Sequence, residues 1–308
     1  MASTLLQLVQ GATGEMGLAV PTTVIGNTNQ DVVQWLYLSK AAGLELCREH
    51  QWQKITKEYR FTTVYYTYTA TVTSGSTTLS VLSSTTGLTT TPTYFMVNGT
   101  GIENDTYLVS VDAGTATAVM SQAATASGTA VSITFGQSMY AFPSDFDRQV
   151  DRTHYDKSQH WEMIGPQSAQ QWQWLKSSFV TSGPRVRYRP LGGLFQIWPS
   201  PSTNDYLGFE YVSSNWVFAA ADTVTPSKAT FTVDTDTCIF HDRLMILAIK
   251  KKYFEIKGFD TTAFYRDYVS ELSKAKAMEA GDQTLSMNPR VRSYLIGIEN
   301  VPDSDFGP

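Results

Sequence analysis

Cysteine and charge are both scarce in this sequence. Cys47 and Cys238 are the two cysteines among 308 residues, and neither belongs to a CxxC or Cys/His grouping. This spacing favours unpaired thiols in a reducing compartment, packed inside the protein. Charged residues make up 17% of the chain, against about a quarter in typical soluble domains. Together with 12% aromatic residues, so little charge indicates extensive burial against other subunits, although a β-rich monomer could share this composition.

Signals for targeting, membrane insertion and catalysis are also missing. The first basic residue is Lys40, so we expect no secretory signal peptide, and no apolar run is long enough to span a membrane. No GxSxG, HExxH or Walker sequence occurs, so we expect neither an enzyme nor a bound cofactor or metal. The net charge of -5 argues against a dedicated nucleic-acid-binding protein. These absences predict a soluble protein that is made in the cytoplasm.

Helices are predicted near both ends of the sequence. The longest begins at Asn29 and stops before Trp52, where a strand begins. Its apolar face repeats every three or four residues and comprises Val32, Leu36, Ser39, Gly43 and Leu46. Further helices are predicted over Ser3–Met16, His241–Lys257 and Thr261–Ala280, the last two as a hairpin whose helices end at glycines.

The composition changes sharply between Thr67 and Ser138. Thr, Ser, Gly and Ala dominate this stretch, and its charged residues are Glu103, Asp105 and Asp112. Short runs of β-branched and aromatic residues alternate with glycine-containing turns at fairly even spacing, which is the pattern of a small β-sandwich or barrel. A disordered Ser/Thr linker is the alternative, and the regular β-prone runs favour the folded module.

Mixed strand and helix patterns return after Tyr140. The predicted elements are a strand over Arg148–Tyr155, a helix over Ser168–Phe179, a hairpin of Arg185–Arg189 and Leu194–Trp198 joined at Gly192-Gly193, and a strand over Tyr206–Val212 that Asn215–Phe218 continues. The predicted fold class is α+β, with a helical-bundle core, a small β-hairpin and sheet region and an inserted all-β module, either sandwich or barrel. We expect a discontinuous core at residues 1–66 and 139–280, the β module at 67–138 and an extended C-terminal arm at 281–308.

Two groups of side chains that could bind a metal ion are weak candidates for a metal site. His154 and Asp156 lack a third and fourth ligand at the spacing of a zinc site. Asp145, Asp147 and Asp151 lack the glycine and the terminal glutamate of a calcium-binding loop. Structural roles are therefore favoured for both groups.

Basic side chains form two groups of greater interest. Arg185, Arg187 and Arg189 alternate along one predicted strand, so one strand face carries three guanidinium groups. This row could bind acidic side chains of a neighbouring subunit or face a phosphate backbone, and an ordinary exposed strand face is an equal alternative. Lys250 and Lys251 could likewise touch DNA, although a solvated helix end is favoured.

The C-terminal stretch Gly281–Pro308 combines basic and apolar residues. Its central part holds Arg290, Arg292, Tyr294, Leu295 and Ile296. Segments with such an apolar patch order on binding, because burial of the patch offsets the lost chain entropy. We interpret the stretch as a docking arm, with a disordered terminus as the alternative.

Collinear segments outside the β module carry a family resemblance. In chain order they are VPTTVIGNTNQDVVQWLYLSKAAGLELCREHQWQKITKEYRFTT, FPSDFDRQVDRTHYD, GPQSAQQWQWLKS, GPRVRYRP with LFQIWPSPS, FEYVSSNWV and DTDTCIFHDRLMILAIKKKYFEIKGFD. This series resembles the head-to-tail adaptor proteins of short-tailed bacteriophages, the head-completion or tail-tubular A-like family. The resemblance rests on the order of the segments, because none of them carries a catalytic motif.

The resemblance implies a structural function in a phage virion, at the interface of head and tail. Family members form a twelvefold ring beneath the portal, which extends the DNA conduit and carries the tail nozzle. The helices would build the ring, with Gln34, Tyr37 and Glu45 as candidate subunit contacts, and the arm would reach the portal. The implied partners are further copies of the chain in a dodecameric ring, the portal protein, tail nozzle or tail fibre proteins and passing DNA without sequence specificity, with no membrane. The β module departs from the minimal family pattern, so the alternative is a phage surface protein that binds glycans through this module.

Overall fold

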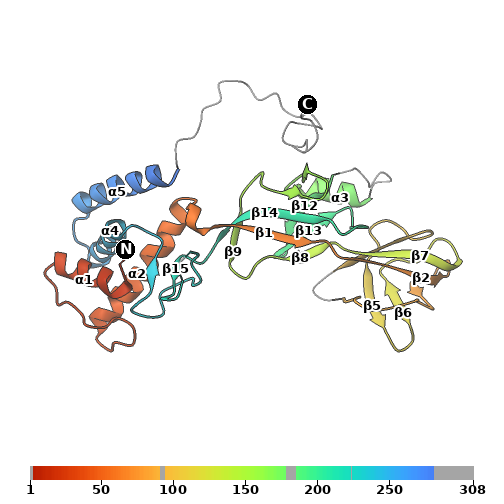
Figure 1. Cartoon of the computed structure of the whole chain (residues 1–308), viewed down its shortest axis with the longest axis horizontal. Helices are drawn as coiled ribbons and strands as arrows, with labels where there is room; N and C mark the ends of the chain where they lie inside the picture. The colour runs from red at the N-terminus through yellow and green to blue at the C-terminus, as the bar shows by residue number, and fades with distance from the viewer. Residues whose placement is uncertain (1–2, 91–93, 178–184, 223, 281–308) are drawn as a thin grey trace, which may run out of the picture. The chain divides into compact units, whose positions relative to one another are not determined.

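The computed structural model describes residues 3–90, 94–177, 185–222 and 224–280. Helices and several small antiparallel sheets make up this part of the chain, which confirms the predicted α+β class (Figure 1). The described residues fall into two compact units. Unit 1 comprises residues 3–57, 145–149 and 211–280, and unit 2 comprises residues 58–144 and 150–210. Residues 67–138, the predicted β module, therefore share a unit with residues 150–210.

Unit 1 contains the helices predicted near the two ends of the sequence. They are α1 (Leu5–Glu15), α2 (Gln30–Glu49), α4 (Asp242–Lys257) and α5 (Thr262–Ala280), with a short 3-10 turn, η1 (Gln53–Ile55), after α2. Polar side chains cap the first two helices: the Thr4 hydroxyl accepts from the Gln7 amide, and the Asn29 side chain accepts from the Asp31 amide. Gly258 follows α4 with a φ of +71°, in the left-handed region that glycine adopts most easily.

The apolar face of α2 packs in the core of unit 1. Trp35 of α2 stacks on Tyr253 of α4, with ring centroids 4.4 Å apart. Gly43 lies on the same face, beside the Trp216 ring. A Cβ added at Gly43 would come within 2.1 Å of a ring carbon of Trp216, so this position requires glycine. The Trp52 indole nitrogen donates a 2.7 Å hydrogen bond to a carbonyl oxygen near the end of α2. The predicted helix stripe is therefore a core face.

Residues Asn215–Phe218 do not continue the preceding strand, and this prediction is wrong. Strand β14 (Tyr206–Ser213) ends where the Ser214 amide donates to the Asp145 carbonyl. The next residues join a separate two-stranded sheet instead. Its strands are β15 (Val217–Phe218) and β16 (Thr237–Cys238).

The single strand predicted over Arg148–Tyr155 is also wrong, because two short strands are present. β9 (Phe146–Gln149) pairs with the end of β14 in unit 1, and β10 (Tyr155–Asp156) pairs with the start of β14 in unit 2. Arg152, between them, has a φ of +62°, a left-handed conformation that interrupts extended backbone.

Two antiparallel sheets and a helix form the part of unit 2 outside the β module. The first sheet has strand order β1-β14-β10-β11, and the second has order β12-β13-β8. The remaining elements are β1 (Thr56–Thr62), β8 (Met139–Ala141), β11 (Trp161–Glu162), α3 (Ala169–Ser177), β12 (Arg187–Leu191) and β13 (Leu194–Trp198). The β12–β13 hairpin turns at Gly192 and Gly193, whose φ values of +60° and +77° explain the two glycines and confirm the predicted hairpin.

A stack of aromatic rings joins these two sheets. The His154 ring lies 4.0 Å from the Tyr188 ring and 5.0 Å from the Phe209 ring, measured between centroids. Phe195 stacks on Tyr188 and Phe209 at 5.3 and 5.0 Å. Each of the four side chains is at most 1% exposed, so the stack is the interior of this part of unit 2.

Residues 67–138 form strands, as predicted. The module has one sheet of β2 (Tyr65–Val72), β7 (Gly128–Gln137) and β4 (Phe95–Gly99), and another of β3 (Thr78–Leu79), β6 (Thr117–Met120) and β5 (Leu108–Asp112). In the described residues the two sheets stay separate rather than closing into a barrel, and single bridges link Thr71 to Ser80 and Met96 to Tyr107. Both sheets contribute side chains to one apolar core, which makes this a folded module rather than a linker.

Candidate interaction surfaces

The predicted arginine row lies on the β12–β13 hairpin. Arg187 and Arg189 are in β12, opposite Trp198 and Gln196 of β13, and Arg185 precedes the strand. Residues that oppose each other in an antiparallel pair share a face of the sheet, so Arg187 lies beside Trp198 and Arg189 beside Gln196. Trp198 packs against α3 on this face. The arginine row therefore shares its face with the α3 contact.

These three arginines lack anionic partners in the part of the chain that the structure describes. All three are partly buried, and no ion pair or side-chain hydrogen bond joins them to another described residue. The Arg185 Nε is enclosed and has no hydrogen-bond acceptor among the described residues. Enclosing a charged group without a partner is costly, because lost hydration is not replaced. The row is therefore able to accept carboxylates from outside the described residues.

Lys250 and Lys251 already have partners inside unit 1. The Lys250 ammonium, in a residue only 7% exposed, lies 2.8 Å from the Glu15 carboxylate, and this hydrogen bond lowers the pKa of Glu15. The Lys251 ammonium lies 4.7 Å from the Tyr268 ring centre and 3.6 Å from the Glu255 carboxylate. These contacts join α1, α4 and α5, so the arginines are the freer of the two basic groups.

The other predicted contacts lie on α2 or outside the described residues. Tyr37 is 66% exposed, Gln34 is partly buried and Glu45 pairs with Lys252 of α4. The predicted arm contacts that lie outside the described residues are Arg290, Arg292, Tyr294, Leu295 and Ile296.

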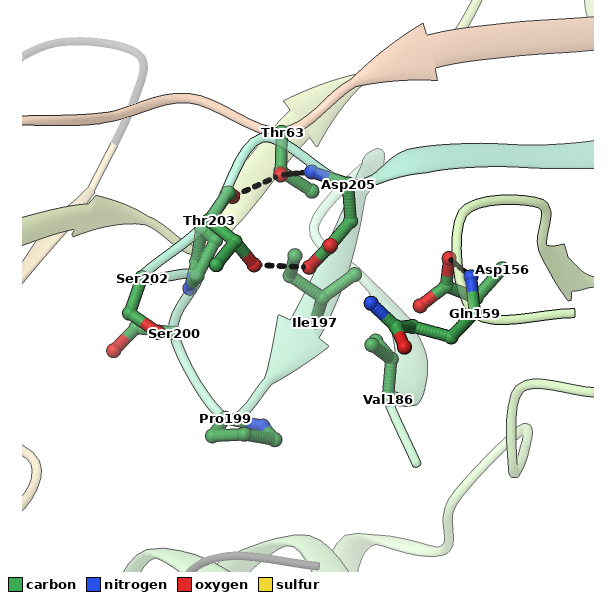
Figure 2. A pocket seen from close by; sticks show the side chains of 11 residues that line it. Thr63, Asp156, Gln159, Val186, Ile197, Pro199, Ser200, Ser202, Thr203 and Asp205 are labelled. Carbon is green, nitrogen blue, oxygen red and sulfur yellow. Dashed lines mark hydrogen bonds between the residues drawn. The ribbon is translucent and has the colours of Figure 1, made fainter. Parts of the chain in front are cut away.

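Unit 2 also contains a pocket beside the β12–β13 hairpin, which sequence reasoning missed (Figure 2). Its volume is about 190 Å³. Val186, Ile197 and Pro199 form an apolar wall, and none of the described lining residues is aromatic. The polar residues of the lining, called the polar wall below, are Thr63, Asp156, Gln159, Ser200, Ser202, Thr203 and Asp205.

Hydrogen bonds hold the polar wall of the pocket in place. The Thr63 hydroxyl donates to the Thr203 carbonyl at 2.8 Å and accepts from the Asp205 amide at 2.7 Å. The Thr203 hydroxyl donates to one carboxylate oxygen of Asp205 at 2.9 Å (Figure 2). One oxygen of Asp156 accepts from two main-chain amides of the following turn, at 2.9 and 3.1 Å. The wall is therefore formed before any partner arrives.

Two carboxylates of this pocket lack a counter-ion among the described residues. Asp156 is 4% exposed, and burial raises the pKa of its carboxyl. Its second oxygen has no hydrogen-bond partner in the described part of the chain and points toward the pocket in Figure 2. The second oxygen of Asp205 likewise accepts no hydrogen bond from a described residue. A cation at this position would recover electrostatic energy that burial of Asp156 has cost.

The weak candidates for metal binding are held by other contacts. His154 lies in the aromatic stack, where burial lowers its pKa to about 4 and neither ring nitrogen has a hydrogen-bond partner within the described residues. Asp145 pairs with Lys57 at 2.7 Å and accepts hydrogen bonds from the hydroxyls of Tyr211 and Ser213. Across the described ranges, no three His, Cys, Asp or Glu side chains converge as metal ligands do.

The family of the chain follows from comparison with known proteins. Residues 111–293, more than half of the chain, match the family model described as SU10 adaptor protein. The chain belongs to the SU10 adaptor protein family. It is accordingly a bacteriophage adaptor protein, with a structural role in the virion. No curated protein matches the chain, and no described helix is long and apolar enough to cross a membrane.

The matched span covers only part of the segments on which the predicted resemblance rests. It begins in β5 of the β module and includes the arginine row, most of the pocket and both α4 and α5. The segments before residue 64, including α2, lie outside it. The comparison therefore supports a phage adaptor, and the position of that adaptor in the particle is a proposal.

Proposed function

We propose that this chain is a head-to-tail adaptor of a short-tailed phage. In this proposal twelve copies form a ring beneath the portal, extend the DNA conduit and provide the platform for the tail nozzle. The observation that carries the proposal is membership of a phage adaptor family. A charged fraction of 17% agrees with a chain that buries much of its surface against other subunits.

The helices of unit 1 supply the ring-building core in this proposal. A ring subunit must bury helix faces beyond those that form its own core. Such faces exist in unit 1, since Tyr37 and Leu44 of α2 are 66% and 48% exposed. Tyr265 and Val269 of α5 are also exposed. Large exposed side chains on two helices support a helical bundle that associates laterally with further copies.

The remaining contacts of the proposed adaptor involve the arm and the β module. Residues 281–308 would dock on the portal, with Arg290, Arg292 and the apolar residues 294–296 as contacts. Residues 67–138 would be an inserted module that meets the tail nozzle or the tail fibres. DNA would pass without sequence-specific contacts, in agreement with a net charge of -5.

Electron microscopy of the full chain mixed with purified portal protein tests this function. We expect rings stacked on the portal, with fewer or none on a chain truncated after Ala280. Full ring attachment by the truncated chain would overturn the arm assignment. Absence of any complex between the full chain and the portal would overturn the adaptor position itself.

A second candidate function is glycan binding through the β module. The observation that favours it is a pair of tyrosines on the module surface, Tyr94 and Tyr107, each 41% exposed and packed edge to face with centroids 6.0 Å apart. Exposed aromatic rings can stack on the apolar faces of sugars. A glycan array probed with the full chain and with the Tyr107→Ala variant tests this function, and it predicts signals that the substitution removes. Equal signals from both chains, or none from the full chain, would exclude this role.

A further inference from the structure

The pocket and the arginine row are complementary in charge and lie on the same hairpin. The pocket presents two carboxylates without a counter-ion among described residues, and the row presents guanidinium groups without an anion there. We propose that the pocket of Asp156, Gln159 and Asp205 receives a guanidinium group from Arg187 or Arg189 of a second copy of this chain. This inference rests on the proposed ring and specifies one of its subunit contacts.

The chemistry of the pocket fits a guanidinium group better than other ligands. A guanidinium is flat, offers five donors in a fixed fork and packs readily against apolar surface. The pocket lining combines the apolar side chains of Val186 and Ile197 with one unbonded carboxylate oxygen on each of Asp156 and Asp205, counted among the described residues. A sugar would use an aromatic platform, which the described lining lacks. No three His, Cys, Asp or Glu side chains of the described residues converge in the pocket as the ligands of a zinc site would.

The geometry of the hairpin explains why the partner is a second copy. Val186 lines the pocket, whereas its neighbour Arg187 lies on the face of Trp198, because successive side chains of a strand point to opposite sides. Ile197 of the facing strand lines the pocket too, and it opposes Tyr188 rather than an arginine. Pocket and arginines thus occupy opposite faces of one hairpin. Two different surfaces that complement each other form a head-to-tail contact, which closes into a ring when the rotation permits.

The pocket chemistry can be tested on the full chain without any assembly. Titration with N-acetyl-arginine amide, followed by amide NMR, should shift signals of residues 156–159 and 203–205 with millimolar affinity. N-acetyl-lysine amide should bind at least threefold more weakly. Asp156→Asn keeps an oxygen that can accept the hydrogen bonds from the two main-chain amides of the turn. Asp156→Asn and Asp205→Asn should each weaken arginine binding by at least threefold. Asp112→Asn, in the β module, is the matched control and should change nothing. Absence of shifts, or equal binding by the Asp variants, overturns the guanidinium pocket.

The identity of the partner is tested by assembly on the portal. Arg187→Gln with Arg189→Gln, and separately Asp156→Asn with Asp205→Asn, should each reduce ring formation at least tenfold, while Asp112→Asn rings form normally. In a 1:1 mixture of the two double variants, the pocket of the arginine variant can still bind the arginines of the pocket variant, but the reverse contact is lost. Light scattering of this mixture should therefore detect dimers and no rings. Rings formed by either double variant overturn the contact between copies. If the wild-type chain forms no ring on the portal, the adaptor proposal and the copy-to-copy contact both fail, and the NMR titration alone then decides the chemistry of the pocket.

Discussion

Acidification from pH 7 to pH 4 should destabilise unit 2 through His154. The neutral imidazole is stacked among three aromatic rings at 1% exposure, and burial lowers its pKa from 6.5 to about 4. In the unfolded chain the same group takes up a proton near pH 6.5. The unfolded state therefore binds more protons between these two values, and stability falls as the pH falls through this window. This difference in pKa between the unfolded and folded states corresponds to about 3 kcal/mol in the free energy of unfolding. That contribution is fully present above pH 6.5 and is lost by pH 4.

Hydrogen exchange of the β13 and β14 amides, measured at pH 6.5, 5.5 and 4.5 and corrected for intrinsic rates, reports this effect locally. Burial raises the pKa of Asp156, so its contribution to the pH dependence of stability has the opposite sign and opposes the loss. His154→Phe preserves the stack and should abolish most of the pH dependence. His160→Asn, an exposed control at a φ of +58° that asparagine tolerates, should retain it. If exchange in the wild-type protein is unchanged across this range, or if His154→Phe keeps the full pH dependence, then His154 is not the group that couples stability to pH.

Three further predictions concern unit 1. Gly43→Ala should destabilise the protein by about 1–3 kcal/mol in urea denaturation, because its Cβ would meet the Trp216 ring. Gly14→Ala, in an exposed helical position with open space beside it, should instead stabilise by about 0.5–1 kcal/mol, and a loss similar to that of Gly43→Ala would contradict the packing argument. Asp236 is 1% exposed and pairs with Lys228 at 2.7 Å, so Asp236→Asn should cost about 2 kcal/mol or more, and a neutral effect would show that this pair is dispensable.

The helices and the hairpin could be predicted because their determinants are local. Asn29 caps α2, Gly258 ends α4, and the Gly192–Gly193 pair supplies the positive φ values of the turn. The β-branched and glycine pattern likewise predicted the strands of residues 67–138. Each signal lies within a few residues of the structure that it determines.

The pocket could not be predicted because its determinants are far apart in the sequence. Thr63 forms hydrogen bonds with residues 203 and 205, which are 140 and 142 positions away in the sequence. The sequence around residues 203 and 205 has the composition of an ordinary polar turn. The end of β14 has the same origin, because the hydrogen bond from the Ser214 amide to the Asp145 carbonyl is a tertiary contact. The alternation of the arginines correctly placed Arg187 and Arg189 on one face, but it gave no information about α3 on that face.

Electron microscopy of the full chain with purified portal protein tests the head-to-tail adaptor most directly. We expect a twelvefold ring of this chain attached to the portal vertex, with a central channel wide enough for duplex DNA. A chain that remains separate from the portal at micromolar concentrations of both proteins would contradict it.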